Sequence, residues 1–365
     1  GAFRITLLEK RDDHSHSTMY DYSTKRQFVC NVESLVKLPI DQLRSLGGRL
    51  MSVVANTNRL SDVLELAEIC WTKRGDGEGK RVDEDDEDDE DDKIDGTALL
   101  EWLSLRDNRL KSLAGVAPLL STLEHLSIEM NDIGQLDDLL YCCSGDAGVG
   151  GGVGGGGTSA TYPLRTLLAS NNRIQSLGPL CYNNIFKCLE TLALYRNNIC
   201  EIPPGLTAAL PNLRHLDLGR NKITSVENLN LDACPLLETL ILYENLIDKM
   251  PVTRNVCLRE VWMNGNQLVD LSPLSNGISS WGPSVETLYL HDNQIKSLDR
   301  GTLLSYPMLR VLDLSFNQLS SLDDLRVLSG CPHITSLKLN DNPLCDLPDY
   351  RRRVLLALPH LMELD

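Results

Sequence analysis

The sequence predicts an α/β solenoid in which short parallel strands stack into one curved sheet. The first observation is an eleven-residue phrase, Leu-x-x-Leu-x-Leu-x-x-Asn-x-Leu, whose clearest copy is LRHLDLGRNKI at residues 213–223. The second is recurrence, because eleven copies align on their asparagine, and those from Asn172 onward lie 21 to 27 residues apart. The anchoring asparagines are Asn58, Asn108, Asn131, Asn172, Asn197, Asn221, Asn245, Asn266, Asn293, Asn317 and Asn342.

The spacing of the apolar residues explains why each copy forms a strand and then a turn. Alternate residues of a strand point to opposite sides, so Leu216 and Leu218 face a common core while His215 and Asp217 face outward. The buried amide of Asn221 can bond backbone groups that the following turn leaves unpaired. One copy cannot bury its own apolar face, so eleven strands about 4.8 Å apart stack into a concave wall roughly 48 Å long. Phrase and period together are the signature of a leucine-rich repeat solenoid of about ten to eleven repeats.

The solenoid is expected to occupy residues 50–347 and to carry two insertions. The first copy, at residues 50–60, is degenerate, and a helical stretch at 61–71 follows it. Ten adjacent carboxylates at residues 83–92 repel one another, which predicts a disordered loop at about 74–96 that is either solvated or recruits basic partners. A glycine-rich tract predicts a second such loop at about 144–161. This tract lacks the Gly-Lys-Ser/Thr ending of a phosphate-binding loop.

Caps are expected at both ends of the solenoid. Residues 1–49 form the N-terminal cap region, with a strand pair expected within 3–9 and 18–30, and His14 and His16 in a polar stretch are solvated loop residues. At the other end, Pro348 stops the last repeat and opens a short helix at 349–358. Val354, Leu355 and Leu358 should pack on the last repeat while the arginines at 351–353 stay in water. Residues 348–365 therefore form the C-terminal repeat cap.

Charge and cysteine content exclude several classes of protein. The formal net charge is -16, and the run at residues 83–92 supplies ten of those negative charges, so nothing favours nucleic acid as a partner. No segment has the length of a signal peptide core or a membrane span, so no membrane association is expected. Eleven cysteines without a Cys-x-x-Cys pair favour reduced thiols and an intracellular protein. Four of them fall where repeats need small buried residues: Cys181, Cys234, Cys257 and Cys331. Two pairs stay open as redox or metal sites: Cys142 with Cys143, and Cys188 with Cys200.

The concave wall holds the candidate functional residues. The fifth and seventh positions of each phrase should face outward there, and in the second half of the chain they carry tryptophan, tyrosine and acidic residues. The inward positions are already filled by the phrase leucines, so these aromatic residues have no core role. Exposed aromatic residues flanked by carboxylates are typical of a protein-binding hot spot for a basic partner. The candidate partner-binding residues are Tyr195, Asp217, Tyr243, Glu244, Glu260, Trp262, Tyr289, His291, Asp313 and Phe316.

Three stretches resemble a known family. LREVWMNGNQL at 258–268, VETLYLHDN at 285–293 and YRRRVLLALPHLMELD at 350–365 are similar to segments of leucine-rich repeat regulators of protein phosphatase 1, of the regulatory-subunit-7 type. Related shapes occur in the spliceosomal A-prime protein and in axonemal dynein light chain one. The resemblance implies that the concave face grips the phosphatase catalytic subunit, with Glu260, Trp262 and Tyr289 at matching positions. Ile241 departs from the family where an acid is expected, and two further repeats separate Tyr289 from the cap.

The leading hypothesis is a non-enzymatic scaffold that binds the catalytic subunit of a type-1 Ser/Thr phosphatase and is monomeric by itself, in the cytoplasm or nucleus. The alternative is a structural or assembly protein of the cytoskeleton or axoneme, located in a flagellum or the cytoskeleton. A third interpretation, an acidic histone or RNA-processing chaperone, depends on the run at residues 83–92. No cofactor, metal or catalytic residue is predicted, because His125, His215 and His291 lie on separate strands and no nucleophile accompanies them.

Overall fold

The computed structural model describes residues 26–29, 35–38, 43, 50–66, 100–143, 161–251, 253–271, 283–298, 306–321, 328 and 331–365. The acidic insertion, almost all of the glycine-rich insertion and the first 25 residues lie outside these ranges. The predictions made for them therefore stay predictions. The helix expected at 61–71 is described only to its sixth residue.

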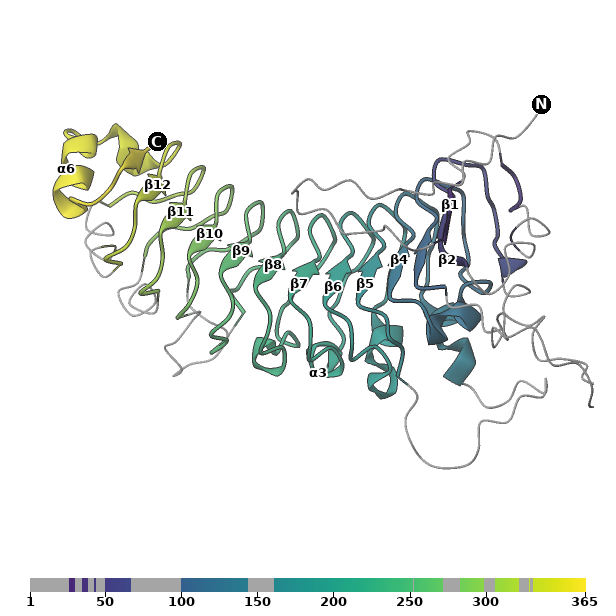
Figure 1. Ribbon diagram of the computed structural model, residues 1–365. Helices are drawn as coiled ribbons and strands as arrows, with labels where there is room; N and C mark the ends of the chain where they lie inside the picture. The colour runs from purple at the N-terminus through teal and green to yellow at the C-terminus, as the bar shows by residue number, and fades with distance from the viewer. Residues whose placement is uncertain are drawn as a thin grey trace, which may run out of the picture.

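Within the described residues, thirteen short strands form one parallel sheet whose spatial order is their order in the chain. Figure 1 shows them succeeding one another along an open arc, with the short helices on the opposite side of the repeats. The predicted solenoid is confirmed, and it is longer by one strand at each end than the eleven copies of the phrase. The strands are β1 (Arg26–Val29), β2 (Leu50–Val54), β3 (Trp102–Ser104), β4 (His125–Ser127), β5 (Thr166–Leu168), β6 (Thr191–Ala193), β7 (His215–Asp217), β8 (Thr239–Ile241), β9 (Glu260–Trp262), β10 (Thr287–Tyr289), β11 (Val311–Asp313), β12 (Ser336–Lys338) and β13 (Glu363–Leu364).

Several returning segments contain short helices on the other side of the repeats. Most are 3-10 helices of three to seven residues. They are η2 (Ala117–Ser121), η3 (Asp137–Cys143), η4 (Gly178–Asn184), α3 (Leu206–Ala209), η5 (Leu231–Ala233), η6 (Pro343–Asp346) and α6 (Tyr350–Ala357). Among the described residues, no helix reaches the length and apolarity that crossing a bilayer requires.

The core is one continuous column of leucine and isoleucine side chains between the sheet and these turns. The phrase leucines are buried throughout, with Leu216 1% and Leu218 0% exposed in the copy at 213–223. Each repeat covers the apolar face of its neighbour, so the core runs without a break from Leu35 to Leu358. Stacking of this kind fixes the direction of every strand side chain, which is how the fold positions the residues of the open sheet face.

The anchoring asparagines form a ladder of hydrogen bonds between neighbouring repeats. The backbone N–H of Ile199 donates to Asn221 Oδ1 at 3.1 Å, and Asn221 Nδ2 donates to the carbonyl oxygens of Leu194 and Leu218, each at 3.0 Å. Equivalent bonds recur in every later copy up to Asn342. The predicted role of the asparagine amide is confirmed, and its bonds join two repeats rather than one.

One feature of the turn was not predicted from the sequence. The residue before each of the eleven asparagines has a positive φ, for example +52° at Arg220 and +53° at Phe316. This left-handed conformation favours glycine, yet Gly265 is the only glycine at these eleven positions. The conformation is therefore imposed by the asparagine ladder and the stacked strands, not by the type of residue that adopts it.

The two ends of the sheet differ from the expectation in detail. Strand β1 pairs in parallel with β2, and the N–H of Leu35 donates to Asn58 Oδ1, so this part of the N-terminal region is an incomplete repeat. At the other end, α6 lies between β12 and β13, and Val354 within it and Leu358 directly after it are buried. Leu355 was wrongly assigned to the packed face: it is 48% exposed, because Tyr350, Val354 and Leu358 lie four residues apart and occupy that face instead.

Candidate functional site

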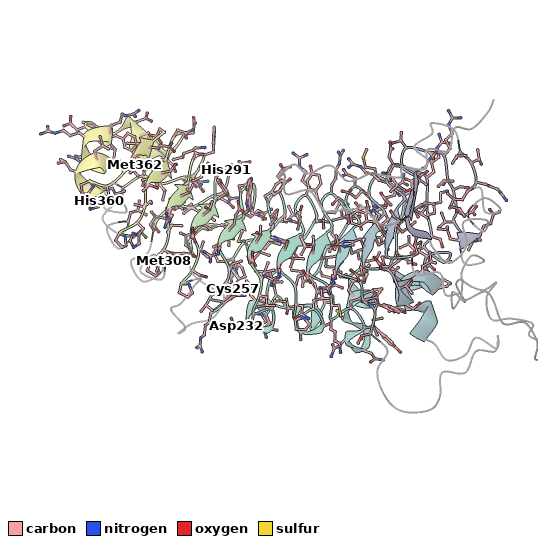
Figure 2. All side chains as sticks on the ribbon, in the orientation of Figure 1. Asp232, Cys257, His291, Met308, His360 and Met362 are labelled. Carbon is pink, nitrogen blue, oxygen red and sulfur yellow. The ribbon has the colours of Figure 1, made fainter. Side chains whose placement is uncertain are left out.

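Five aromatic rings form a connected row on the open sheet face. We call Tyr195, Tyr243, Trp262, Tyr289 and His291 the aromatic stripe. Their ring centroids are separated by 5.9 Å, 6.3 Å, 4.3 Å and 6.4 Å in that order. All five are half-buried, which leaves part of each ring open to a partner. His291, labelled in Figure 2, is the last ring of this row.

The centre of the stripe is the pair of neighbouring rings on β9 and β10. Trp262 and Tyr289 occupy the fifth positions of adjacent phrases and are directly paired in register, so their rings approach to 4.3 Å at an angle of 45°. Trp262 Nε1 donates a hydrogen bond of 2.9 Å to Glu260 Oε1 on the same strand face. The indole is thus held on two sides, and the predicted trio of Glu260, Trp262 and Tyr289 is brought together.

The stripe continues toward the N-terminal half through two tyrosines. Tyr195 lies beside Tyr243, and the guanidinium carbon of Arg220 lies 5.7 Å from the centre of the Tyr195 ring. Arg220 also forms an ion pair of 2.7 Å with Glu244. Burial, followed by the hydrogen bond with Tyr195, raises the pKa of Tyr243 to about 12, so its hydroxyl stays protonated at neutral pH.

Asp217 ends β7, the strand between those that precede Tyr195 and Tyr243. Its carboxylate accepts a 2.9 Å hydrogen bond from the backbone N–H of Gly219. Burial raises the pKa of the Asp217 carboxyl, and the Gly219 hydrogen bond opposes that rise. Asp217 is half-buried, so part of its side chain contacts neighbouring residues of the sheet face instead of solvent.

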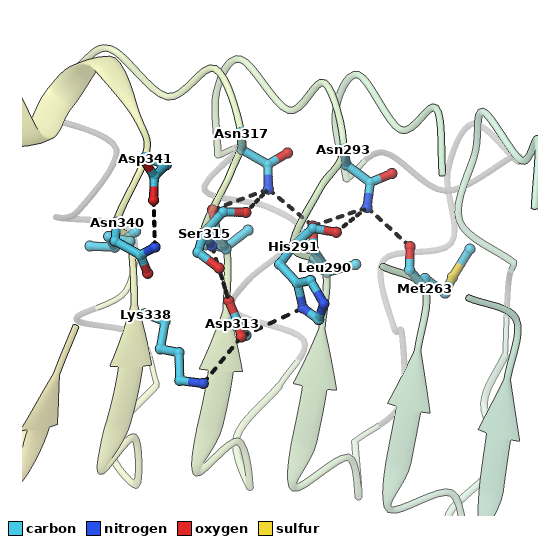
Figure 3. Close-up of polar contacts among 12 residues, drawn as sticks. Met263, Leu290, His291, Asn293, Asp313, Ser315, Asn317, Lys338, Asn340 and Asp341 are labelled. Atoms are coloured by element: carbon cyan, nitrogen blue, oxygen red, sulfur yellow. Dashed lines mark hydrogen bonds and ion pairs between the residues drawn. The ribbon is translucent and has the colours of Figure 1, made fainter. Parts of the chain in front are cut away.

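A polar cluster adjoins the C-terminal end of the stripe. Asp313 is only 5% exposed, and its Oδ1 accepts hydrogen bonds from the backbone N–H (3.0 Å) and the hydroxyl (2.6 Å) of Ser315. Its Oδ2 lies 3.5 Å from His291 Nδ1 and 3.6 Å from Lys338 Nζ. Figure 3 shows the carboxylate between these two side chains. Asp313 was expected to face a partner, but its neighbours cover it, and Lys338 is the exposed charge of this cluster.

Two predicted residues lie at the rim of the sheet face instead of within the stripe. Phe316 follows strand β11 at the left-handed turn position and is 54% exposed. Glu244 occupies the same turn position after β8 and is exposed, but its carboxylate is engaged by Arg220. Both are accessible, and neither is among the residues whose rings touch in the stripe.

Sequence analysis missed the part that four residues play on this face. Gly219 and Arg220 carry no partner-binding signal by residue type, although their seventh and eighth positions in the phrase place them beside the tyrosines. Trp102 and His125 form a separate ring pair with centroids 4.5 Å apart, at the third positions of neighbouring phrases. Sequence analysis placed His125 on its own strand and did not pair it with Trp102, which stands at the third position of the phrase before it.

Within the described part of the chain, no side chains are grouped for metal binding and no cysteines are paired. No group of three or more His, Cys, Asp or Glu residues is placed there to hold a metal ion. The seven cysteines whose side chains are described are free thiols, including those of Cys188 and Cys200. Of the four expected to be buried, Cys234 and Cys331 are, whereas Cys181 and Cys257 are half-buried.

Comparison with known proteins agrees with the fold. A family profile described as leucine rich repeat matches residues 163–223, 187–247 and 283–344, which together cover less than half of the chain. Among solved structures, an internalin from Listeria monocytogenes has a TM-score of 0.59 at 18% identity and covers 93% of this chain and 86% of its own. A leucine-rich repeat protein of Leptospira interrogans also has a TM-score of 0.59, at 20% identity, covering 91% and 76%.

Curated relatives share parts of the chain only. Leucine-rich repeat-containing protein 23 of Bos taurus is 32% identical over 42% of this chain and 44% of its own length, and that of Homo sapiens 29% over 55% and 62%. The U2 small nuclear ribonucleoprotein A' of Candida glabrata is 40% identical over 22% of this chain and 30% of its own. The chain thus spans less than two thirds of the length of each relative. The profile, the relatives and the structural neighbours all contain leucine-rich repeats, which agrees with the leucine-rich repeat solenoid fold of this chain.

Proposed function

We propose that the chain is a non-enzymatic scaffold that binds a protein partner through the aromatic stripe. The observation that carries this proposal is the continuous contact of five half-exposed rings on the sheet face, none of which fills the core. Tyrosine and tryptophan are the residues most enriched among binding hot spots, because each ring buries a large area at a small cost in side-chain entropy. Neighbouring rings that already touch also lose little further freedom when a partner binds.

We propose the catalytic subunit of a type-1 Ser/Thr phosphatase as this partner. The support is the resemblance of residues 258–268, 285–293 and 350–365 to the phosphatase regulators, together with the place of the three residues that match by position. Glu260 and Trp262 are joined by a hydrogen bond, and Trp262 contacts Tyr289 on the next strand. A trio that the resemblance treats as one contact site is therefore one surface in this fold.

The charges around the stripe favour a partner that presents basic side chains. Glu260 is half-exposed beside Trp262, and Asp292 is exposed at the rim beside His291. Carboxylates at the edge of an aromatic patch steer a basic surface toward it and fix its register more than they add affinity. Lys338, at the C-terminal end of the face, carries the opposite charge. The sign of the exposed charge therefore changes along the solenoid axis, which favours one orientation of the partner.

The test is calorimetric titration of the purified type-1 catalytic subunit into the full chain. Truncation of a buried tryptophan anchor costs about 2 to 4 kcal/mol, so Trp262→Ala should weaken binding roughly 30-fold or more. Tyr182→Ala is the control, because Tyr182 is also an aromatic side chain and is 43% exposed on η4, away from the sheet face. Equal affinities for wild type and Trp262→Ala, or no binding at all by wild type, would remove the phosphatase as partner.

We further propose an intracellular location, in the cytoplasm or nucleus. The support is chemical: the cysteines described are free, and one of them, Cys200, is exposed to solvent. A reducing compartment preserves such thiols. Microscopy of the tagged chain should show a diffuse pool that detergent extracts, whereas retention in the detergent-resistant cytoskeleton would favour the structural or axonemal role instead.

A further inference from the structure

Two tyrosines of the aromatic stripe meet across a strand that separates them. Tyr195 follows β6 and Tyr243 follows β8, with β7 between. Strands in a sheet are about 4.8 Å apart, so residues at equivalent positions two strands away are roughly 9.6 Å apart. The ring centroids nevertheless approach to 5.9 Å. The rings must therefore lean over β7, and something in β7 has to leave room for them.

The room is provided by Gly219, which occupies the equivalent seventh position of the phrase after β7. A Cβ atom at Gly219 would lie 2.8 Å from Tyr243 Cε1, closer than such atoms approach, and 3.0 Å from Cδ1, which is a tight contact, so the ring would have to shift. It would also lie 3.2 Å from Asp217 Oδ1. The other ten copies carry a side chain at this position. The absence of a side chain at Gly219 is thus what seats the Tyr243 ring.

Backbone conformation does not account for this glycine. The two described glycines with positive φ are Gly205 and Gly265, so the backbone of Gly219 lies in a region that any residue adopts. The three atoms nearest to an alanine Cβ at position 219 belong to the Tyr243 ring edge and the Asp217 carboxylate, both of which are movable side-chain ends. The fold can therefore accept the substitution, and its cost falls on the position of Tyr243.

Tyr243 is the link between the two parts of the stripe. It contacts Tyr195 on one side and Trp262, at 6.3 Å, on the other. Displacing its ring would separate Tyr195 from the trio of Glu260, Trp262 and Tyr289. The N–H of Gly219 also donates to Asp217 Oδ1, which, like the Tyr243 ring edge, lies near the space that a side chain at position 219 would fill.

We propose that Gly219 is a positioning residue of the interaction face, whose missing side chain lets Tyr243 close the aromatic stripe over β7. The expected effect of Gly219 on binding rests on the proposed function. The position of the Tyr243 ring rests on the geometry alone. Gly219 itself touches no partner, so its effect passes through Tyr243.

A double-mutant cycle measures this effect with the purified type-1 phosphatase catalytic subunit as the probe. Gly219→Ala should weaken binding about tenfold, which is the scale of one misplaced anchor. In a Tyr243→Ala background the same change should have no further effect, because the ring that it displaces is gone. Gly134→Ala is the matched control, since a Cβ there meets nothing within 4 Å. Equal weakening in both backgrounds would overturn the inference.

A second measurement decides the inference without a partner. In a background with Trp71→Phe, Trp102→Phe and Trp281→Phe, Trp262 is the only tryptophan, and acrylamide quenching of its fluorescence reports how well Tyr243 covers it. Gly219→Ala should raise the quenching constant, Gly134→Ala should leave it unchanged, and neither should add to Tyr243→Ala. If wild type fails to bind the phosphatase, the proposed partner is wrong, but the quenching data still test whether Gly219 positions the Tyr243 ring. Quenching in Gly219→Ala equal to that in Gly134→Ala would overturn the positioning role.

Discussion

Substitution of one rung of the asparagine ladder, Asn221→Ala, offers a quantitative test of how the repeats are held together. Asn221 is 8% exposed, and its amide bonds both its own repeat and the one before. Alanine fits the same space but has no polar atoms. The backbone N–H of Ile199 would lose its acceptor inside the protein, where water cannot replace it.

The magnitude follows from the groups left behind. An unsatisfied buried N–H costs about 1 to 3 kcal/mol. The carbonyl oxygens of Leu194 and Leu218 would each lose one bond of about 0.5 to 1.5 kcal/mol, but each keeps a second, from Asn197 and Asn245 respectively. The free energy of unfolding should therefore fall by about 2 to 6 kcal/mol, a large part of what a domain usually has.

Urea unfolding followed by far-UV circular dichroism measures this loss. The matched control is Asn230→Ala, because Asn230 is exposed and its side chain makes no capping bond to η5, so the change should stay within about 0.5 kcal/mol. Asn221→Asp should also destabilise, since a carboxylate keeps the acceptor for Ile199 but repels the two carbonyl oxygens. If Asn221→Ala proves as stable as Asn230→Ala, the ladder does not hold the repeats together and the reasoning is refuted.

Two further predictions concern the cap and the stripe. Val354→Ala truncates a fully buried side chain of α6 and should lower the free energy of unfolding by about 1 to 2 kcal/mol. Leu355→Ala, on the exposed side of the helix, should change it by less than about 0.5 kcal/mol. Thermal unfolding of both variants checks this, and equal losses would contradict the packing. Because the pKa of Tyr243 is raised to about 12, its contribution to stability is complete below its unfolded pKa near 10 and is lost as the pH rises to about 12. Tyr243→Phe should therefore lose less stability than wild type over that interval in urea titrations, and an identical loss would contradict a buried phenol.

The repeats of this fold were predictable because their physical causes are local in the sequence. The phrase leucines specify the buried side of each strand, and Asn221 and its equivalents mark each turn. A strand was expected within residues 18–30, where β1 lies, but its place as a further repeat of the solenoid was not. The reason is that Glu33, not asparagine, stands two residues before Leu35, the position that an anchor occupies elsewhere. The left-handed turns also escaped, since residues as different as Arg220 and Phe316 adopt them under the force of the stacked structure.

The candidate site was predictable in its residues and not in their contacts. Phrase position alone placed Tyr195, Tyr243 and Trp262 on the sheet face. Which rings touch depends on how the side chains lean across the strands. Here that depends on Gly219, because it has no side chain to block the Tyr243 ring. Likewise, Asp313 occupies a facing position by register but is covered, because Ser315 and its other neighbours close around its carboxylate.

Hydrogen–deuterium exchange of the chain with and without the type-1 catalytic subunit tests the central claim most directly. If the aromatic stripe is the binding surface, slowed exchange should concentrate in peptides covering residues 191–196, 239–244, 260–265 and 287–292, along neighbouring strands. Peptides covering η2 and α3, on the opposite side of the repeats, should be unchanged. Protection confined to those helices, with none on the strands of the stripe, would contradict the claim that the sheet face binds the partner.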